Sequence, residues 1–202
     1  MNVLAHALAA RAAGQSPVDQ ILGDFVKGDP ATRYAGPPLE GIVLHRALDR
    51  FTDQHPITLR SRRRVAPAYR RYAGVLTDLY YDHFLARHFA VFEPQPLADF
   101  ARECYAECQR RAPGLPPDMQ RFIRYMLEHD LLVRYAEADV IEDVLRRMAG
   151  RLRRRNELAA AASQLRHDYA GFEADTLAFM PAMLAYARDW SRPPAPSTEV
   201  PP

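Results

Sequence analysis

The sequence predicts an all-α protein, an irregular multi-helix bundle of eight to ten helices, on three observations. Apolar residues recur at helical spacing along most of the chain, and the alternating patterns typical of strands are nearly absent. Gly and Pro clusters divide the chain into helix-length segments. With 202 residues, of which 48% are hydrophobic and 26% charged, the chain is long enough to bury a substantial core.

The helices expected in the first half are bounded by Gly and Pro residues. Gly14 and the Ser16-Pro17 pair separate the first two helices, and the Gly36-Pro37-Pro38 cluster marks a loop. Pro56 and Gly74 divide the later ones. The expected helices cover residues 2–13, 17–27, 39–53, 56–72, 75–90 and 96–111.

In the second half, the segment APGLPP at residues 112–117 is not expected to be helical. Helices are expected at 118–133, at 138–149 and, as one long helix, from about 151 to 189, where Pro181 should kink or interrupt it. Residues 191–202 are Pro-rich with little apolar content and are expected to form a disordered tail. The prediction is therefore a single helical catalytic domain over residues 1–190.

Composition excludes several classes of protein. The formal charge of +2 does not indicate a general polyanion binder, and no apolar run reaches the roughly 18–20 residues of a membrane span. The N-terminal segment lacks the leading positive charge of a signal peptide. Cys104 and Cys108 lie four residues apart without a CxxC motif, which favours reduced thiols. We therefore expect a soluble, cytoplasmic protein.

Histidine and aspartate are concentrated before residue 90, where five of the seven histidines and seven aspartates lie. Two spacings stand out. His45, Asp49 and Asp53 follow one another at intervals of four, so they share one helix face. Asp78 and Asp82 repeat that interval, and His83 follows directly.

Imidazole nitrogens and carboxylate oxygens together suit Mn, Fe, Zn or Mg. Large apolar neighbours place these helix faces near the core, where a bound cation would remove the cost of burying unpaired carboxylates. Either pair alone is more often a surface ion pair or a cap. The two pairs, together with Asp24 in the apolar segment ILGDFVKG, favour a metal site.

Such a site suits phosphate-ester hydrolysis, because a divalent cation activates water and screens charge on a phosphoryl oxygen. Lys27, Arg46 and Arg50 flank the acidic positions and could meet a phosphate, although Arg50 fits a surface ion pair better. The motifs of other chemistries are missing from the sequence: there is no P-loop, GxGxxG, GxSxG or HExxH.

Four segments in order carry a family resemblance: MNVLAH at the start, DFVKG at 24–28, HRALDRFTD at 45–53 and DHFLARHF at 82–89. Together they resemble the bacterial acyl carrier protein phosphodiesterases, from Met1 to about Trp190. The resemblance implies a helical fold like that of the HD phosphohydrolases with rearranged helix order. It also implies hydrolysis of the phosphodiester between 4'-phosphopantetheine and a serine of holo acyl carrier protein, with a divalent metal, preferably manganese.

An HD-type site uses two histidines and two aspartates. Carried over to the best-matching segments, this implies Asp24, His45, Asp82 and His83 as metal ligands. His6, Asp49 and Asp78 are alternates, with His6 the added ligand candidate, and Asp49, Asp78, Lys27 and Arg46 are the catalytic candidates. One departure is the pair Asp19-Gln20, where the family pattern has Gly-Asn.

Because acyl carrier protein is strongly acidic, the resemblance implies a basic docking face. The favoured stretch follows the helix expected to carry His45 and Asp49 and contains Arg60, Arg62, Arg63, Arg64, Arg70 and Arg71. A second stretch contains Arg146, Arg147, Arg151, Arg153, Arg154 and Arg155. A solvated helix face is the alternative for either stretch, and no nucleic-acid motif supports nucleic-acid binding.

Two other functions stay open at this point. One is an HD-like phosphohydrolase acting on a nucleotide or another small phosphoester, which needs no protein partner. The other is a non-catalytic helical partner protein in which the His/Asp pairs form a structural ion-pair network. The sequence leaves the oligomeric state, the native metal and the number of ions open.

Overall fold

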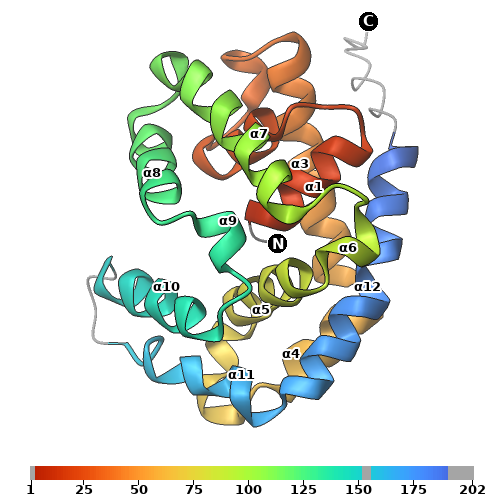
Figure 1. The fold of residues 1–202 in the computed structure, drawn as a ribbon, viewed down its shortest axis with the longest axis vertical. Helices are drawn as coiled ribbons and strands as arrows, with labels where there is room; N and C mark the ends of the chain where they lie inside the picture. Colours follow the sequence, from red (N-terminus) through yellow and green to blue (C-terminus); the bar gives the residue numbers. More distant parts are fainter. Residues whose placement is uncertain (1–2, 152–155, 191–202) are drawn as a thin grey trace, which may run out of the picture.

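The computed structural model describes residues 3–151 and 156–190, and within those ranges it contains α- and 3₁₀-helices and no strand (Figure 1). The all-α prediction is confirmed. The α-helices are α1 Val3–Ala12, α2 Pro17–Leu22, α3 Gly36–Gln54, α4 Pro56–Arg64, α5 Ala73–Arg87, α6 Phe89–Phe92, α7 Leu97–Arg111, α8 Pro117–Glu128, α9 Leu131–Arg134, α10 Ala138–Arg151, α11 Gln164–His167 and α12 Tyr169–Asp189. The 3₁₀-helices are η1 Gly23–Phe25, η2 Pro30–Thr32, η3 Pro67–Tyr72, η4 Ala112–Gly114 and η5 Ala160–Ser163.

Helix α1 forms the centre of the bundle. Its residues 3–10 are all buried, and they pack against α2, α5 and α12. A helix that is apolar on every side belongs in a core, because no face of it gains from contact with water. The consequence is that His6, on α1, lies inside the protein with about 1% of its surface exposed.

Several expected helices are shorter than predicted or are divided. The α-helices expected over 17–27 and 56–72 end early as α2 and α4, which are followed by the 3₁₀-helices η1 and η3. The segment 112–117, expected to be non-helical, contains the 3₁₀-helix η4 and the first residue of α8. The segment 118–133 divides into α8 and α9 at Asp130, whose backbone is left-handed (φ 45°). The single helix expected over 151–189 is wrong. Within the described part of that segment the chain forms η5 and α11, and α12 starts after Asp168, whose carboxylate accepts a hydrogen bond from the Gly171 amide. Helix α12 then continues through Pro181.

The loop expected at 36–38 is instead the start of α3. Pro at the first turn of a helix is favourable, because the missing N–H would have no partner there and the fixed φ is already helical. The expected tail, 191–202, lies outside the described residues. No helix in the described ranges has both the length and the apolarity that crossing a bilayer requires.

The N-terminus of α1 is held by a buried carboxylate. Asp82, on α5, accepts hydrogen bonds from the backbone amides of Leu4 at 2.8 Å and Ala5 at 2.9 Å. The first amides of a helix have no partner within the helix, so a carboxylate there satisfies them and also interacts favourably with the helix dipole. Asp82 therefore fixes where α1, and with it His6, stands relative to α5.

A second buried carboxylate joins α4 to α12. Asp175 accepts hydrogen bonds from Arg60 Nε, Arg64 Nε and Ser61 Oγ, each at 2.8 Å. Bonds between charged partners are short and strong, and here they compensate the burial of a charge that is only 1% exposed. Two of the arginines expected in the docking face are therefore engaged within the fold.

We predict that Asp82→Ala destabilises the protein, because it leaves two buried amides without an acceptor. The expected loss in the free energy of unfolding is about 1–3 kcal/mol, measured by urea denaturation of the chelator-treated protein. The matched control is Asp143→Ala, which removes an exposed carboxylate paired with Arg146 and should change stability by less than about 0.5 kcal/mol. Equal effects of the two substitutions would contradict the capping role.

Candidate metal centre

Three side chains from two helices converge inside the bundle: His6 on α1, and His45 and Asp49 on α3. Their ligand atoms all lie within 4.8 Å of one another. The carboxylate of Asp49 contacts both imidazoles, with Oδ1 3.2 Å from His6 Nε2 and Oδ2 3.2 Å from His45 Nε2. The two rings stack with centroids 3.9 Å apart, so their Nε2 atoms face the same point.

Asp24 adds a fourth group from a third element. It lies on η1, and its Oδ1 is 3.5 Å from His45 Nε2. The side chain is 56% exposed, in contrast to the two buried histidines. The cluster therefore has a buried side formed by the imidazoles and an open side formed by Asp24.

Close approach of η1 to α3 depends on Gly23. A Cβ at this position would lie 2.3 Å from Cγ of His45, closer than real Cβ contacts allow. A similar constraint applies at Gly41, where a Cβ would lie 2.4 Å from Cβ of Asp19 on α2. The two glycines therefore allow α2 and η1 to pack directly on α3 beside His45.

The side chains of the cluster shift one another's pKa values. Burial alone would lower the pKa of His45, but hydrogen bonds to Asp24 and Asp49 outweigh it and raise that pKa to about 9. Burial and the charge of His45 lower the pKa of His6 to about 4. Burial would raise the pKa of Asp49, but its hydrogen bonds to His45 and His6 bring it well below the usual range. The cluster thus combines anionic Asp49 with a neutral His6.

The contacts of His6 are compatible with a cation beside it. Its Nδ1 lies 3.3 Å from Oε1 of Gln20, and its Nε2 lies 3.2 Å from Asp49. A neutral imidazole carries one N–H, so it can donate to only one of these oxygens. If Nδ1–H donates to Gln20, the lone pair of Nε2 faces the Asp49 side and can bind a cation; in the other tautomer Nε2–H donates to Asp49.

The distances also fit a metal. Ligand bonds of about 2.1 Å place neighbouring ligands about 3.0 Å apart in an octahedral site and about 3.4 Å apart in a tetrahedral one. The three donor separations given above, 3.2, 3.2 and 3.5 Å, lie close to those values. His6, His45, Asp49 and Asp24 therefore fit a divalent cation in ligand type and in spacing, without indicating which one.

Two expected ligands are not brought into this cluster. Asp82 is used to cap α1, as described above. His83 donates from Nδ1 to the Tyr135 carbonyl at 2.8 Å and accepts at Nε2 from the Tyr169 hydroxyl at 2.8 Å, so both ring nitrogens are engaged. Burial lowers the pKa of the His83 ring. Asp82 and His83 thus lie outside the His6–His45–Asp49 cluster and contact other helices in this structure.

The four catalytic candidates lie in different settings. Asp49 is part of the cluster, and Asp78, on α5, is partly buried nearby, close enough for the Asp49 charge to affect its pKa. Arg46 donates to the Val26 carbonyl at 2.8 Å and the Gly28 carbonyl at 2.9 Å. It thus anchors the loop that carries Lys27, whose side chain is exposed.

Sequence patterns missed Gln20, Gly23 and the position of Arg62. Gln20, half of the pair that departs from the family pattern, orients His6. Arg62, on α4, pairs with Asp53 and lies near enough to Asp78 to lower its pKa. The departure at Asp19-Gln20 was the sequence signal for Gln20, whose burial only the structure shows, and long-range contacts are needed to find the other two.

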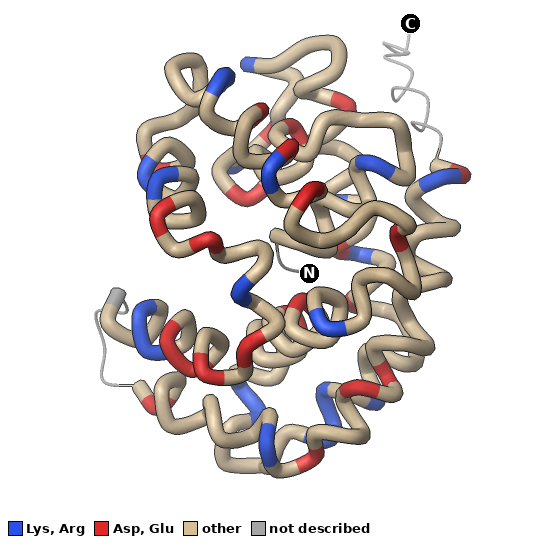
Figure 2. The backbone as a smooth tube through the Cα atoms, viewed as in Figure 1, with Lys and Arg blue, Asp and Glu red and all other residues tan. Residues whose placement is uncertain are grey.

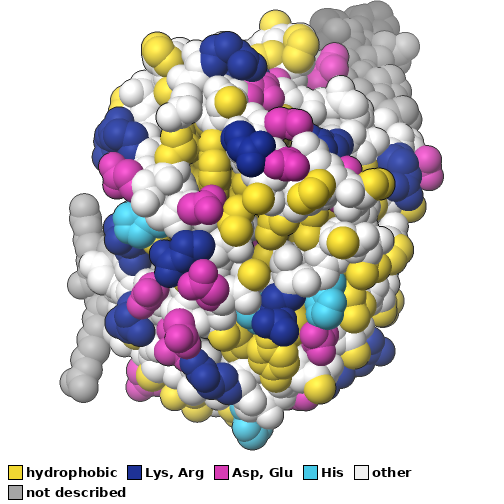
Figure 3. Space-filling model, in the orientation of Figure 1, with side chains coloured by type: hydrophobic (Ala, Val, Ile, Leu, Met, Phe, Trp, Pro, Cys, Tyr) yellow, Lys and Arg dark blue, Asp and Glu magenta, His cyan; other side chains and the backbone are white. Residues whose placement is uncertain are grey.

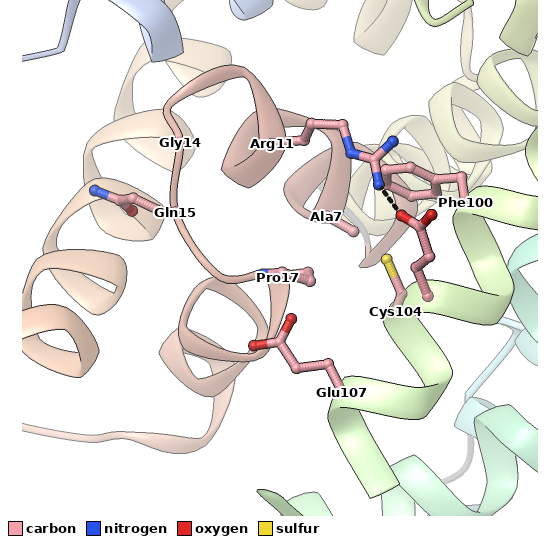
Figure 4. A pocket seen from close by; sticks show the side chains of 9 residues that line it. Ala7, Arg11, Gly14, Gln15, Pro17, Phe100, Cys104 and Glu107 are labelled. Carbon is pink, nitrogen blue, oxygen red and sulfur yellow. Dashed lines mark hydrogen bonds and ion pairs between the residues drawn. The ribbon is translucent and has the colours of Figure 1, made fainter. Parts of the chain in front are cut away.

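Two cavities are candidates for a substrate site. One, of about 310 Å³, has Asp24 and Asp78 in its wall and so adjoins the cluster. The other, of about 290 Å³, lies between α1 and α7 and is lined by Arg11, Phe100 and Cys104 (Figure 4). Burial raises the pKa of Cys104 to about 12, so its thiol is not a nucleophile at neutral pH. The cavity beside the cluster is therefore the better candidate.

Comparison with known proteins agrees with the resemblance described above. The sequence model of the family described as acyl carrier protein phosphodiesterase matches residues 1–183. Relatives with that description include one from Enterobacter sp. (strain 638), 34% identical over 94% of this chain and 98% of the relative, and one from Serratia proteamaculans (strain 568), 35% identical with the same coverage. A relative from Yersinia enterocolitica is 34% identical. No solved structure matches the chain.

We predict that Gly23→Ala weakens binding of Mn²⁺, because the added methyl group displaces the His45 ring. A loss of about tenfold or more in affinity is expected, by calorimetric titration. Gly114→Ala is the matched control, since a Cβ there has no atom within 4 Å, and it should leave the affinity unchanged. Unaltered affinity in Gly23→Ala would argue against His45 as a ligand.

Proposed function

Because the chain belongs to the acyl carrier protein phosphodiesterase family, we propose that it hydrolyses the phosphodiester joining 4'-phosphopantetheine to a serine of holo acyl carrier protein. The products are the apo carrier and 4'-phosphopantetheine. The observation that carries this proposal is the convergence of His6, His45 and Asp49, with Asp24 on the open side. A structural ion-pair network would not require two stacked imidazoles facing one carboxylate.

The four clustered side chains would hold a divalent cation. When bound, it supplies activation of water and screening of charge on a phosphoryl oxygen. Manganese is the cation to test first, on the strength of the family resemblance, and the same nitrogen and oxygen donors accept Mg, Fe or Zn. Gln20 then has the role of orienting His6, since an acceptor for Nδ1–H keeps Nε2 directed at the site.

The chain's own charged groups would bind the phosphate and supply a proton. Lys27 is exposed on the loop that Arg46 anchors, three residues after Asp24, and would bind a phosphate oxygen. Hydrolysis transfers hydroxide from water to phosphorus, and the departing serine oxygen takes a proton. Burial raises the pKa of Asp78, so its carboxyl group holds a proton more readily than an exposed carboxyl and can donate it to that oxygen.

An acidic protein substrate needs positive charge near the site, and the arginine-rich stretch after α3 supplies part of it. Arg60 and Arg64 are bound to Asp175, and Arg62 is paired with Asp53.

Arg63 and Arg71 are exposed, and no carboxylate of a described residue lies within 4.0 Å of either. Arg70 is likewise exposed, although its Nε donates to the Val65 carbonyl at 3.2 Å. We therefore restrict the docking cations of this stretch to Arg63, Arg70 and Arg71.

Elsewhere on the surface, cations and anions alternate. Figure 3 shows positive and negative side chains interspersed on the face in view, with hydrophobic side chains between them, and Figure 2 shows basic and acidic positions interspersed along the backbone. Of the second arginine stretch, Arg146 pairs with Asp143, and Arg151, Arg153, Arg154 and Arg155 fall outside the described side chains. The formal net charge of the chain is only +2. Docking of an acidic carrier would therefore depend on a few local cations rather than on the net charge. The two buried, free thiols of Cys104 and Cys108 fit a protein that acts in the reducing cytoplasm. The substrate there would be the acyl carrier protein of fatty acid biosynthesis.

We predict that purified protein with Mn²⁺ removes phosphopantetheine from holo acyl carrier protein, detected as a loss of carrier mass. Chelator, His6→Ala and Asp49→Asn should each lower the rate by about 100-fold or more, because each removes the cation or a ligand. His167→Ala, an exposed histidine far along the chain, is the matched control and should keep the wild-type rate. A carrier of unchanged mass under these conditions would refute the proposed reaction.

We predict that Arg63→Glu raises KM for the holo carrier several-fold at low salt, with little change in kcat, because docking loses charge complementarity. The effect should fade as the salt concentration rises, and hydrolysis of bis(p-nitrophenyl) phosphate, which needs no docking, should stay at the wild-type rate. Arg188→Glu, an exposed reversal at the end of α12, controls for net charge. Equal effects of the two reversals would place the docking face elsewhere.

A further inference from the structure

The cavity beside the candidate metal centre has features of a binding site for part of the substrate. It lies between α5, α8, α9 and α10, and its volume of about 310 Å³ is at the lower end of the range of roughly 300–1,000 Å³ for small-ligand sites. Asp24 lines it and also lies 3.5 Å from His45 Nε2. A molecule in the cavity can therefore reach the metal cluster.

Apolar and aromatic side chains form most of the cavity wall. They include Phe122, Tyr125, Leu131, Val144 and Met148. Leu131 and Val144 are almost fully buried, so the wall is part of the core and is shaped before a ligand arrives. The two carboxylates in the lining, Asp24 and Asp78, are both close to the cluster, which leaves the rest of the wall suited to an uncharged chain.

One cation lines the cavity. The guanidinium carbon of Arg147, on α10, lies 4.0 Å from the centroid of the Tyr125 ring, a cation–π contact that holds the side chain in place. Arg147 is exposed, and no carboxylate among the described residues lies within 4.0 Å of it. Its hydrogen-bond donors are therefore available to an acceptor on a ligand.

We propose that this cavity receives the pantetheine arm of the substrate, and that Arg147 donates to an amide carbonyl of the arm. This inference rests on the proposed function, because the arm is the part of the substrate that the scissile phosphate joins to the carrier. The arm is an uncharged chain with amide groups. Such a chain matches a cavity whose walls are mostly apolar and whose hydrogen-bond donors include the guanidinium group of Arg147. The phosphate end of the arm would lie toward Asp24 and the metal cluster, where the bound divalent cation and Lys27 would compensate its negative charge.

The test measures binding of free 4'-phosphopantetheine to the Mn²⁺-loaded protein by calorimetry. Arg147→Ala should weaken binding about tenfold, the effect of losing one charge-assisted hydrogen bond. Met148→Trp, which fills the cavity, should weaken it further. Arg146→Ala is the matched control: Arg146 is the adjacent exposed arginine of α10, pairs with Asp143, and does not line the cavity. Mn²⁺ affinity and melting temperature should match wild type in all three variants.

Several outcomes would overturn the inference: no binding of 4'-phosphopantetheine, equal effects of Arg146→Ala and Arg147→Ala, or no effect of Met148→Trp. Tighter binding of adenosine monophosphate, lost in Met148→Trp, would show a nucleotide cavity instead. The reaction itself is tested separately by carrier mass. An unchanged holo carrier together with Arg147-dependent binding would reject the reaction and keep the assignment of the cavity. Conversion of the holo carrier to the apo carrier without Arg147-dependent binding would keep the reaction and reject the assignment of the cavity.

Discussion

The candidate site depends on one carboxylate placed between two imidazoles. Asp49 contacts Nε2 of His6 and Nε2 of His45 at 3.2 Å each, so it fixes two buried rings that come from different helices. A buried anion needs compensation by positive charge, either a proton on His45 or a cation among the donors. The same requirement explains why His45 binds a proton so tightly, and why a metal that replaces this proton would meet a preformed set of ligands.

Three buried or partly buried aspartates differ in the groups that their carboxylates contact, and these contacts indicate what each aspartate does in the fold. Asp82 meets backbone amides and caps α1, Asp175 meets two guanidinium groups and joins α4 to α12, and Asp49 meets imidazoles. Amides and guanidinium groups are hydrogen-bond donors that engage the oxygens of Asp82 and Asp175. Imidazoles are themselves metal ligands, so of these three carboxylates Asp49 is the one whose partners suit metal binding.

The site, its cavity and its nearby cations form a continuous region. Asp24 belongs to the metal cluster and to the cavity wall, and Arg62 connects the region to α4 through its influence on Asp78. A carrier protein docked near α4 could thus place its modified serine at the open side of the cluster. The arm would then extend into the cavity between α5 and α10, with the scissile phosphate at the junction.

The sequence by itself determined the helical class, most helix positions in the first half, and the pairing of His45 with Asp49. These follow from local spacing, since residues four apart on a helix share a face whatever the rest of the chain does. The family resemblance was confirmed as well, and it depends on short segments that sequence alone displays.

Only the tertiary structure decided which groups meet. Asp78 and Asp82 repeat the four-residue interval of His45 and Asp49, and His83 follows directly, yet Asp82 faces the start of α1 and His83 faces Tyr135 and Tyr169. His6 joined the cluster because α1 is central and Gln20 orients its ring. Helical periodicity fixes which face a side chain occupies, but the packing of separate helices fixes what that face contacts, and no local pattern contains that information.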